Sequence, residues 1–132
     1  MSVGNRRIDS EHKKIFEVIH RLQHSIVAKD CAAIVADFKL LEEFARDGFS
    51  MEEKIARKVG FDFTQHDLAH RNLLKKYHQL GDELAARKGF WSDSEGEVYK
   101  NFINDWMMKH LEYESEPLRI VLNTYLYDLE CT

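Results

Sequence analysis

The sequence predicts an all-α protein: an antiparallel up-down-up-down four-helix bundle followed by a short C-terminal helix. Four segments of similar length carry apolar residues at the i, i+3, i+4 spacing of an amphipathic helix. The connections between these segments are short, which places consecutive helices side by side in opposite directions. The 132 residues include one proline and are 44% hydrophobic, a composition typical of a folded, strongly helical chain.

Length and charge narrow the class of protein further. A chain of 132 residues can bury a core without disulfides, so we expect one domain spanning residues 1–132. The net charge is −4 with both signs interspersed, which predicts neither a nucleic-acid surface nor a membrane surface. No apolar run approaches the roughly 20 residues that cross a bilayer. Because residues 1–7 do not resemble a signal peptide, we expect a cytoplasmic protein.

The sequence indicates little about the state of the two cysteines or about oligomerisation. Cys31 and Cys131 lie far apart in the sequence and form no CxxC motif. Two free thiols in a reducing cytoplasm are a simpler interpretation than one disulfide. The sequence leaves the oligomeric state open, a homo-oligomer included.

Capping residues predict where the helices begin. We expect the first helix to begin at Asp9 or Ser10 and to end near residue 28. The second should cover residues 31–58, with Asp30 as its N-cap.

The later helices have similar signals. Thr64 and Asp67 resemble a capping box at the start of the third helix. The segment from Ser94 to Glu97 predicts a second capping box for the fourth helix. After Pro117, the pattern predicts a shorter terminal helix.

The apolar stripes predict which side chains form the core. The stripe of the second helix includes two unusual members, Gly48 and Glu52. Glycine in a helix interior costs about 1 kcal/mol relative to alanine, and a carboxylate is foreign to an apolar stripe. The other expected core members of the second and fourth helices are Ile34, Val35, Phe38, Leu41, Phe44, Ala45, Ile55, Val59, Val98, Phe102, Ile103, Trp106 and Met107.

Four histidines and the glutamate are predicted to meet in one layer of the bundle. His66 and His70 lie four residues apart and therefore share one helix face. Counting residues from each connection places His12, Glu52 and His110 at the same height on the other three helices. Buried imidazoles and a carboxylate are costly unless something satisfies them, and a transition metal would do so. The remaining histidines lie on the flanks of their stripes and are predicted to be exposed: His20, His24 and His78.

Four motifs resemble those of the bacterial hemerythrins. Residues 8–16 (IDSEHKKIF) are similar to the family signature I-D-x-Q-H-K-x-L-F, and residues 48–53 (GFSMEE) to H-F-x-x-E-E. Residues 60–70, which contain Gly-Phe and two histidines, resemble G-Y-P followed by H-x-x-x-H, one residue shorter and without the proline. Residues 106–111 (WMMKHL) resemble W-L-x-x-H-I. The resemblance covers nearly the whole chain in the family's order.

This resemblance implies a non-heme di-iron protein that binds dioxygen, or another small diatomic ligand, rather than an enzyme. Single-domain cytoplasmic members are associated with oxygen storage, delivery or sensing. In the family, the matching histidines of the third and fourth helices hold one iron, and those of the first and second helices hold the other. The implied ligands present in this sequence are His66, His70 and His110 for the first iron, His12 for the second, and Glu52 as a bridge.

The sequence departs from the family at two ligand positions. Gly48 replaces a histidine, and Ser115 replaces the second bridging carboxylate. Glu114 is the obvious substitute because it lies about 40° from His110 around a straight helix, whereas Ser115 lies about 140° away. The competing interpretations are that Glu114 is an exposed surface carboxylate and that Ser115 caps the terminal helix. Weaker candidates for the missing ligand are Glu116, Asp47 and Glu53.

Two other interpretations remain open from the sequence. Three histidines and Glu52 also suit one Fe(II) or Zn(II) ion, with a binding or weak oxidase role. Alternatively, the chain is a degenerate structural or partner-binding bundle that has lost iron.

Overall fold

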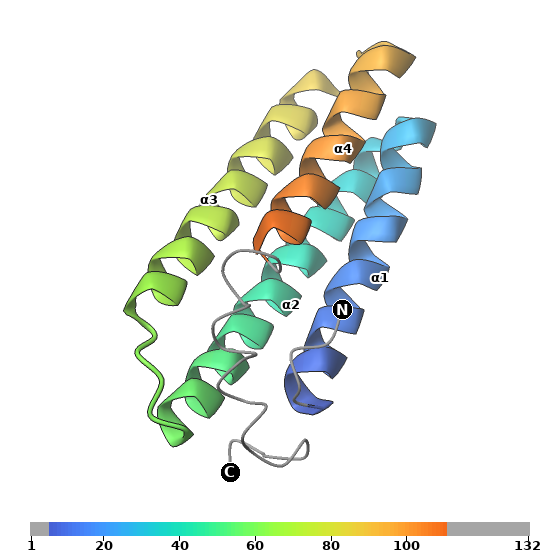
Figure 1. Ribbon diagram of the computed structural model, residues 1–132. Helices are drawn as coiled ribbons and strands as arrows, with labels where there is room; N and C mark the ends of the chain where they lie inside the picture. Colours follow the sequence, from blue (N-terminus) through green and yellow to red (C-terminus); the bar gives the residue numbers. More distant parts are fainter. Residues whose placement is uncertain (1–5, 111–132) are drawn as a thin grey trace.

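The computed structural model describes residues 6–110, which form a bundle of four helices (Figure 1). Helix α1 covers Arg6–Ala28, α2 Cys31–Lys58, α3 Thr64–Arg87 and α4 Asp93–Lys109. Consecutive helices run in opposite directions, and α1 packs against α2 and α4 while α2 also packs against α3. The predicted fold is confirmed. The terminal helix expected after Pro117, Cys131 and the candidates Glu114, Ser115 and Glu116 lie outside the described residues.

The first two helices show how well local signals locate helix ends. Helix α2 has the predicted bounds, and the Asp30 side chain accepts a hydrogen bond of 3.2 Å from the Ala33 N–H. Helix α1 begins at Arg6, so the prediction of a start at Asp9 or Ser10 is wrong. The additional turn carries Ile8, which is 1% exposed and packs with Ile55. Burial of this side chain favours a longer helix than the caps predict.

The capping residues predicted for α3 and α4 are also wrong. Thr64 is the first residue of α3 rather than its cap, and its N–H and hydroxyl both donate to Asp62. The capping box of α4 joins Ser92 and Glu95, two residues before the predicted pair. Several Ser, Thr and Asp residues stand close together at both places, so the sequence does not single out the residue that caps.

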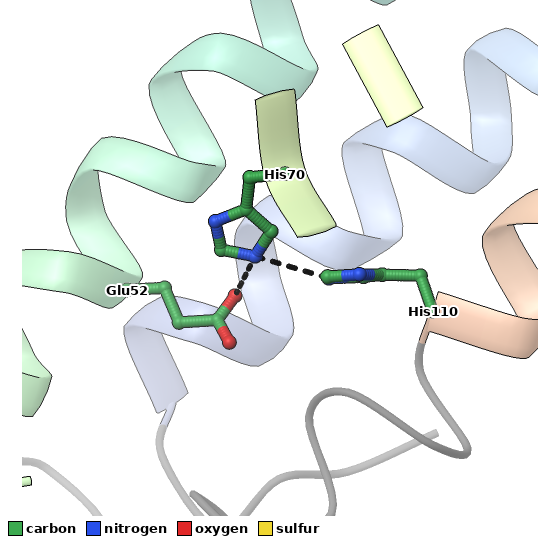
Figure 2. Close-up of side chains that lie close together, drawn as sticks. All are labelled: Glu52, His70 and His110. Carbon is green, nitrogen blue, oxygen red and sulfur yellow. Dashed lines mark hydrogen bonds and ion pairs between the residues drawn. The ribbon is translucent and has the colours of Figure 1, made fainter. Parts of the chain in front are cut away.

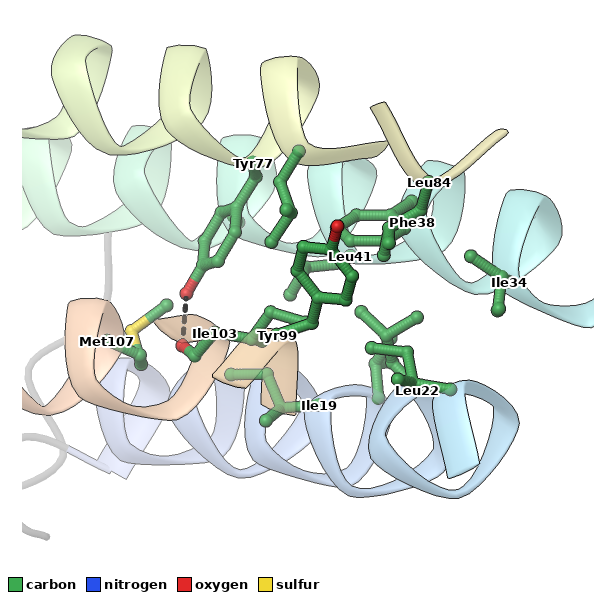
Figure 3. Packing of buried hydrophobic residues seen from close by; sticks show 14 of the residues in the cluster. Ile19, Leu22, Ile34, Phe38, Leu41, Tyr77, Leu84, Tyr99, Ile103 and Met107 are labelled. Carbon is green, nitrogen blue, oxygen red and sulfur yellow. Dashed lines mark hydrogen bonds between the residues drawn. The ribbon is translucent and has the colours of Figure 1, made fainter. Parts of the chain in front are cut away.

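The main core fills the bundle between the four helices (Figure 3). Tyr77 is fully buried there, and its hydroxyl donates to the Ile103 carbonyl at 3.3 Å. A second, small cluster comprises Ile8, Ile55, Ala56 and Phe63, and we call it the apolar cap. It lies at the end of the bundle where α2 connects to α3.

Three predicted core residues lie at the surface instead. Val35 is 52% exposed, Val98 48% and Phe102 44%. Within residues 6–110, α4 packs less closely against α3 than against α1, and Val98 and Phe102 lie on a side of α4 that no described helix covers. A stripe of apolar residues predicts a helix face but not how much of it a neighbour covers.

Across residues 6–110, every helix is too short or too polar to span a lipid bilayer.

Candidate metal centre

The four helices bring five polar side chains to one level of the bundle. We call this set the histidine layer: His12, Glu52, His66, His70 and His110. Glu52 is fully buried, and each of the four histidines is 4% exposed. The layer separates the main core from the apolar cap. The level predicted by counting residues from the helix connections therefore agrees with the level at which these five side chains are observed.

Three of these side chains converge on one point (Figure 2). One ligand atom from each of Glu52, His70 and His110 lies within 4.8 Å of the other two. The Nε2 atoms of His70 and His110 are 3.1 Å apart, and Glu52 Oε2 lies 3.8 Å from His70 Nε2. The three residues come from α2, from α3 and from the C-terminal end of α4.

The other two members, His12 and His66, lie beside this group and are not among the three residues whose ligand atoms converge. His12 Nε2, on α1, lies 3.8 Å from the same Glu52 oxygen that His70 approaches. Glu52 Oε2 thus stands between imidazoles of two different helices. The His66 ring lies one turn before His70, with ring centroids 6.1 Å apart.

The donor atoms fit a bound cation. Among residues 6–110, neither oxygen of Glu52 has a hydrogen-bond partner, and neither His12 Nδ1 nor His110 Nδ1 has one. Buried polar atoms nearly always have a hydrogen-bond partner, and a bound cation would supply the partner that these atoms lack. Two nitrogens that bind one ion at about 2.0–2.1 Å lie at most about 4.2 Å apart. The 3.1 Å between His70 and His110 is within that limit.

The environment keeps the three converging groups in the protonation states that bind metals. Burial lowers the pKa of His70 to about 3 and that of His110 to about 4, so both imidazoles are neutral at pH 7. Burial alone would raise the pKa of Glu52, but His12, His70 and His110 outweigh it and the pKa lies below its usual value. Neutral imidazole and ionised carboxylate are the forms that coordinate a metal ion.

We expect the metal-free protein to lose stability on acidification. Because the pKa values of His70 and His110 are about 3 and 4 when folded and 6.5 when unfolded, the unfolded chain binds more protons below pH 6.5. Glu52 acts in the same direction at lower pH. The free energy of unfolding should fall by about 1–3 kcal/mol per pH unit between about pH 6.5 and 4.5, and these groups should have no effect above that range.

Urea unfolding of metal-free protein at a series of pH values measures this slope. The variant His78→Asn, which changes an exposed histidine, should keep it. A free energy of unfolding that stays constant between pH 7 and 5 would contradict the assignment of neutral buried imidazoles.

Aromatic rings enclose the layer, and the sequence did not single them out as part of the site. Phe49 stacks on His70 with ring centroids 3.8 Å apart and an interplanar angle of 5°. Phe63 lies against His66 with ring centroids 5.3 Å apart. The position of Phe49, three residues before Glu52 on the same helix face, is the signal that could have identified it. These rings restrict the imidazole orientations. Phe49, Phe63 and His70 also line a cavity of 170 Å³.

Gly48 and the weaker carboxylate candidates do not join the converging group. A Cβ atom on Gly48 would lie 3.4 Å from Glu11 Cβ and 3.5 Å from Ile15 Cδ1, so α1 lies directly against this position. Asp47 is exposed, and Glu53 pairs with Arg57 at 2.7 Å.

We expect Gly48→Ala to stabilise the protein by about 0.5–1 kcal/mol. The new methyl group meets only ordinary van der Waals contacts, and alanine favours the helix over glycine. Gly81→Ala is the matched comparison, because its Cβ would lie 3.2 Å from Cγ of the buried Phe38. Gly81→Ala should stabilise the protein less than Gly48→Ala does, or should destabilise it. Urea unfolding of both variants measures the difference, and equal effects would contradict the close packing at Gly81.

The three histidines predicted to lie outside the site are exposed: His20, His24 and His78.

The chain is similar in sequence to proteins named bacteriohemerythrin or hemerythrin-like protein. It is 25% identical over 111 residues to a bacteriohemerythrin of Pseudomonas aeruginosa, covering 84% of this chain and 70% of that protein. A hemerythrin-like protein of Naegleria gruberi is 25% identical over 111 residues, covering 83% and 78%. A bacteriohemerythrin of Methylococcus capsulatus is 25% identical over 107 residues, covering 78% and 76%. No family model and no solved structure matches the chain. The similarity extends over most of the chain and agrees with the resemblance that the motifs indicate.

Proposed function

We propose that this chain is a hemerythrin-like protein that holds non-heme iron in the histidine layer and binds dioxygen there. The observation that supports the proposal most strongly is the convergence of Glu52, His70 and His110 in a buried place where the carboxylate has no hydrogen-bond partner among the described residues. Similarity to bacteriohemerythrins over 84% of the chain supports iron as the metal.

In this proposal, two metal positions share the layer. His66, His70 and His110 hold the first iron, Glu52 lies between the positions, and His12 reaches the second. The placement of Glu52 Oε2 at 3.8 Å from both His12 and His70 supports a carboxylate that serves two positions. Ferrous iron would supply the electrons for reversible binding of a diatomic ligand.

The chain's own residues prepare the site for that chemistry. Burial keeps the imidazoles of His70 and His110 neutral at pH 7, and Glu52, whose pKa lies below its usual value, is ionised there. Phe49 fixes the plane of the His70 ring, and the apolar cap lies beside the histidine layer at the end of the bundle. A preformed set of ligands needs little rearrangement when the metal binds.

The second iron position is the altered one. Gly48 provides no side-chain ligand, so the position keeps His12 and a share of Glu52. We propose that Glu114 completes it.

The decisive experiment adds Fe(II) to the protein without oxygen and then admits air while the absorption spectrum is recorded. We expect near-ultraviolet charge-transfer bands that disappear when oxygen is removed. The variant Glu52→Gln should lose this response, and His78→Gln should keep it. Bound iron with no spectral response to oxygen would overturn the proposal of dioxygen binding.

A site for one metal ion is the second candidate. The absence of a ligand at Gly48 favours it, because three histidines and Glu52 still suffice for one Fe(II) or Zn(II). About one metal per chain, without the bands of an oxo-bridged ferric pair, would support this alternative.

A further inference from the structure

Two exposed histidines on α1 lie close together at a distance from the histidine layer. His20 and His24 are separated by one helical turn, and their Nε2 atoms are 3.3 Å apart. Their ring centroids lie 4.8 Å apart, with an interplanar angle of 86°. His20 follows His12 by eight residues, which corresponds to about 12 Å along the helix. The pair is therefore separate from the buried centre.

We propose that His20 and His24 form a second, surface metal site for a divalent cation of the zinc and copper class. Two nitrogens bound at about 2.05 Å and separated by 3.3 Å subtend an angle of about 107° at the metal, close to the tetrahedral angle that zinc prefers. Imidazole nitrogen suits Zn(II) and Cu(II), and Cu(II) binds most strongly among the divalent first-row metals. Both rings are exposed, so water can fill the remaining coordination positions.

The surroundings leave room for the ion and its water. The two histidines line a cavity of 330 Å³ together with Gln23, Val27 and Lys100. The Gln23 amide donates to the Lys100 carbonyl at 3.3 Å, which ties this wall of the cavity to α4. The Lys100 ammonium group, which would repel a cation, is paired with the Glu97 carboxylate at 3.2 Å. The local charge therefore does not exclude a divalent ion.

The alternative is that the two rings share only a hydrogen bond, in which one imidazole donates to the other. This contact is at the surface, where water can replace it at little cost. A cation gains two nitrogen ligands from one rigid helix turn, which is a chelate. Removal of either ring should therefore weaken binding on the order of 10²-fold.

Calorimetric titration of the full chain with Zn(II), and separately with Cu(II), tests the proposal. We expect wild type to bind one more ion than the double variant His20→Asn/His24→Asn. The variant His78→Asn should match wild type, since that histidine lies on α3 without a neighbouring histidine. Because all these variants share an unchanged histidine layer, the difference does not depend on whether that layer takes iron.

A second variant tests the spacing rather than the number of histidines. His20→Ala/Glu17→His keeps two histidines on exposed positions of α1 but moves them to i and i+7, about 10 Å apart. It should lose the additional ion as the double variant does, and the Cu(II) electron paramagnetic resonance signal should lose the coupling to two nitrogens. Equal Zn(II) and Cu(II) binding by wild type and the double variant would overturn the proposal.

Discussion

Replacing His70 with alanine should abolish stable iron binding while the bundle stays folded. His70 lies at the centre of the converging group, 3.1 Å from His110 Nε2 and 3.8 Å from Glu52 Oε2. Without it, the remaining ligands cannot chelate one ion in the same way, so affinity should fall by at least about 10²-fold. Iron measured after dialysis should drop to near zero.

The fold of this variant is expected to survive because His70 lies outside the main core that packs the four helices together. Burial lowers the pKa of this imidazole to about 3, so its protonated form is strongly disfavoured inside the bundle. Circular dichroism should still report a helical protein. Unfolding of wild type should depend on added Fe(II), because a bound ligand stabilises the native state, and this dependence should vanish in the variant. The exposed control His78→Ala should behave as wild type, and full iron retention by His70→Ala would contradict the assigned centre.

Replacing Leu41 with alanine should destabilise the protein by about 2–5 kcal/mol. Leu41 is fully buried on α2 in the main core, where truncation leaves a cavity (Figure 3). Val35 lies on the same helix and was expected on the same stripe, yet it is 52% exposed. Val35→Ala should therefore change stability by no more than about 0.5 kcal/mol.

Urea unfolding of the two variants measures the contrast directly. Equal losses would mean that α2 is rotated about its axis relative to the described arrangement. Such a rotation would also change the direction of Glu52, so this pair of variants tests the geometry on which the metal centre depends.

The sequence predicted the fold because several independent signals agree along the chain. Helix α2 has the predicted bounds since Asp30 caps its start and Gly60, at φ 72°, follows its end. The level of the histidine layer could be predicted because short connections fix the register between antiparallel helices. Counting residues from each connection was enough to bring Glu52, His70 and His110 together.

Other features depend on information that the pattern does not carry. The exposure of Val98 and Phe102 depends on which side of α4 its neighbours cover, which a periodic stripe does not encode. The role of Phe49 was missed because the apolar stripe predicted for α2 does not include Phe49, and only the three-dimensional arrangement places its ring on His70. The contribution of Glu114 remains a prediction, because it lies outside the described residues.

The most direct test of the central claim is the number of metal ions per chain in protein purified without chelator, together with its iron content after anaerobic addition of Fe(II). We expect at least one tightly held iron per chain, and about two if Glu114 completes the second position. Absence of bound metal under both conditions would contradict the claim and would leave the buried histidines and Glu52 as structural residues.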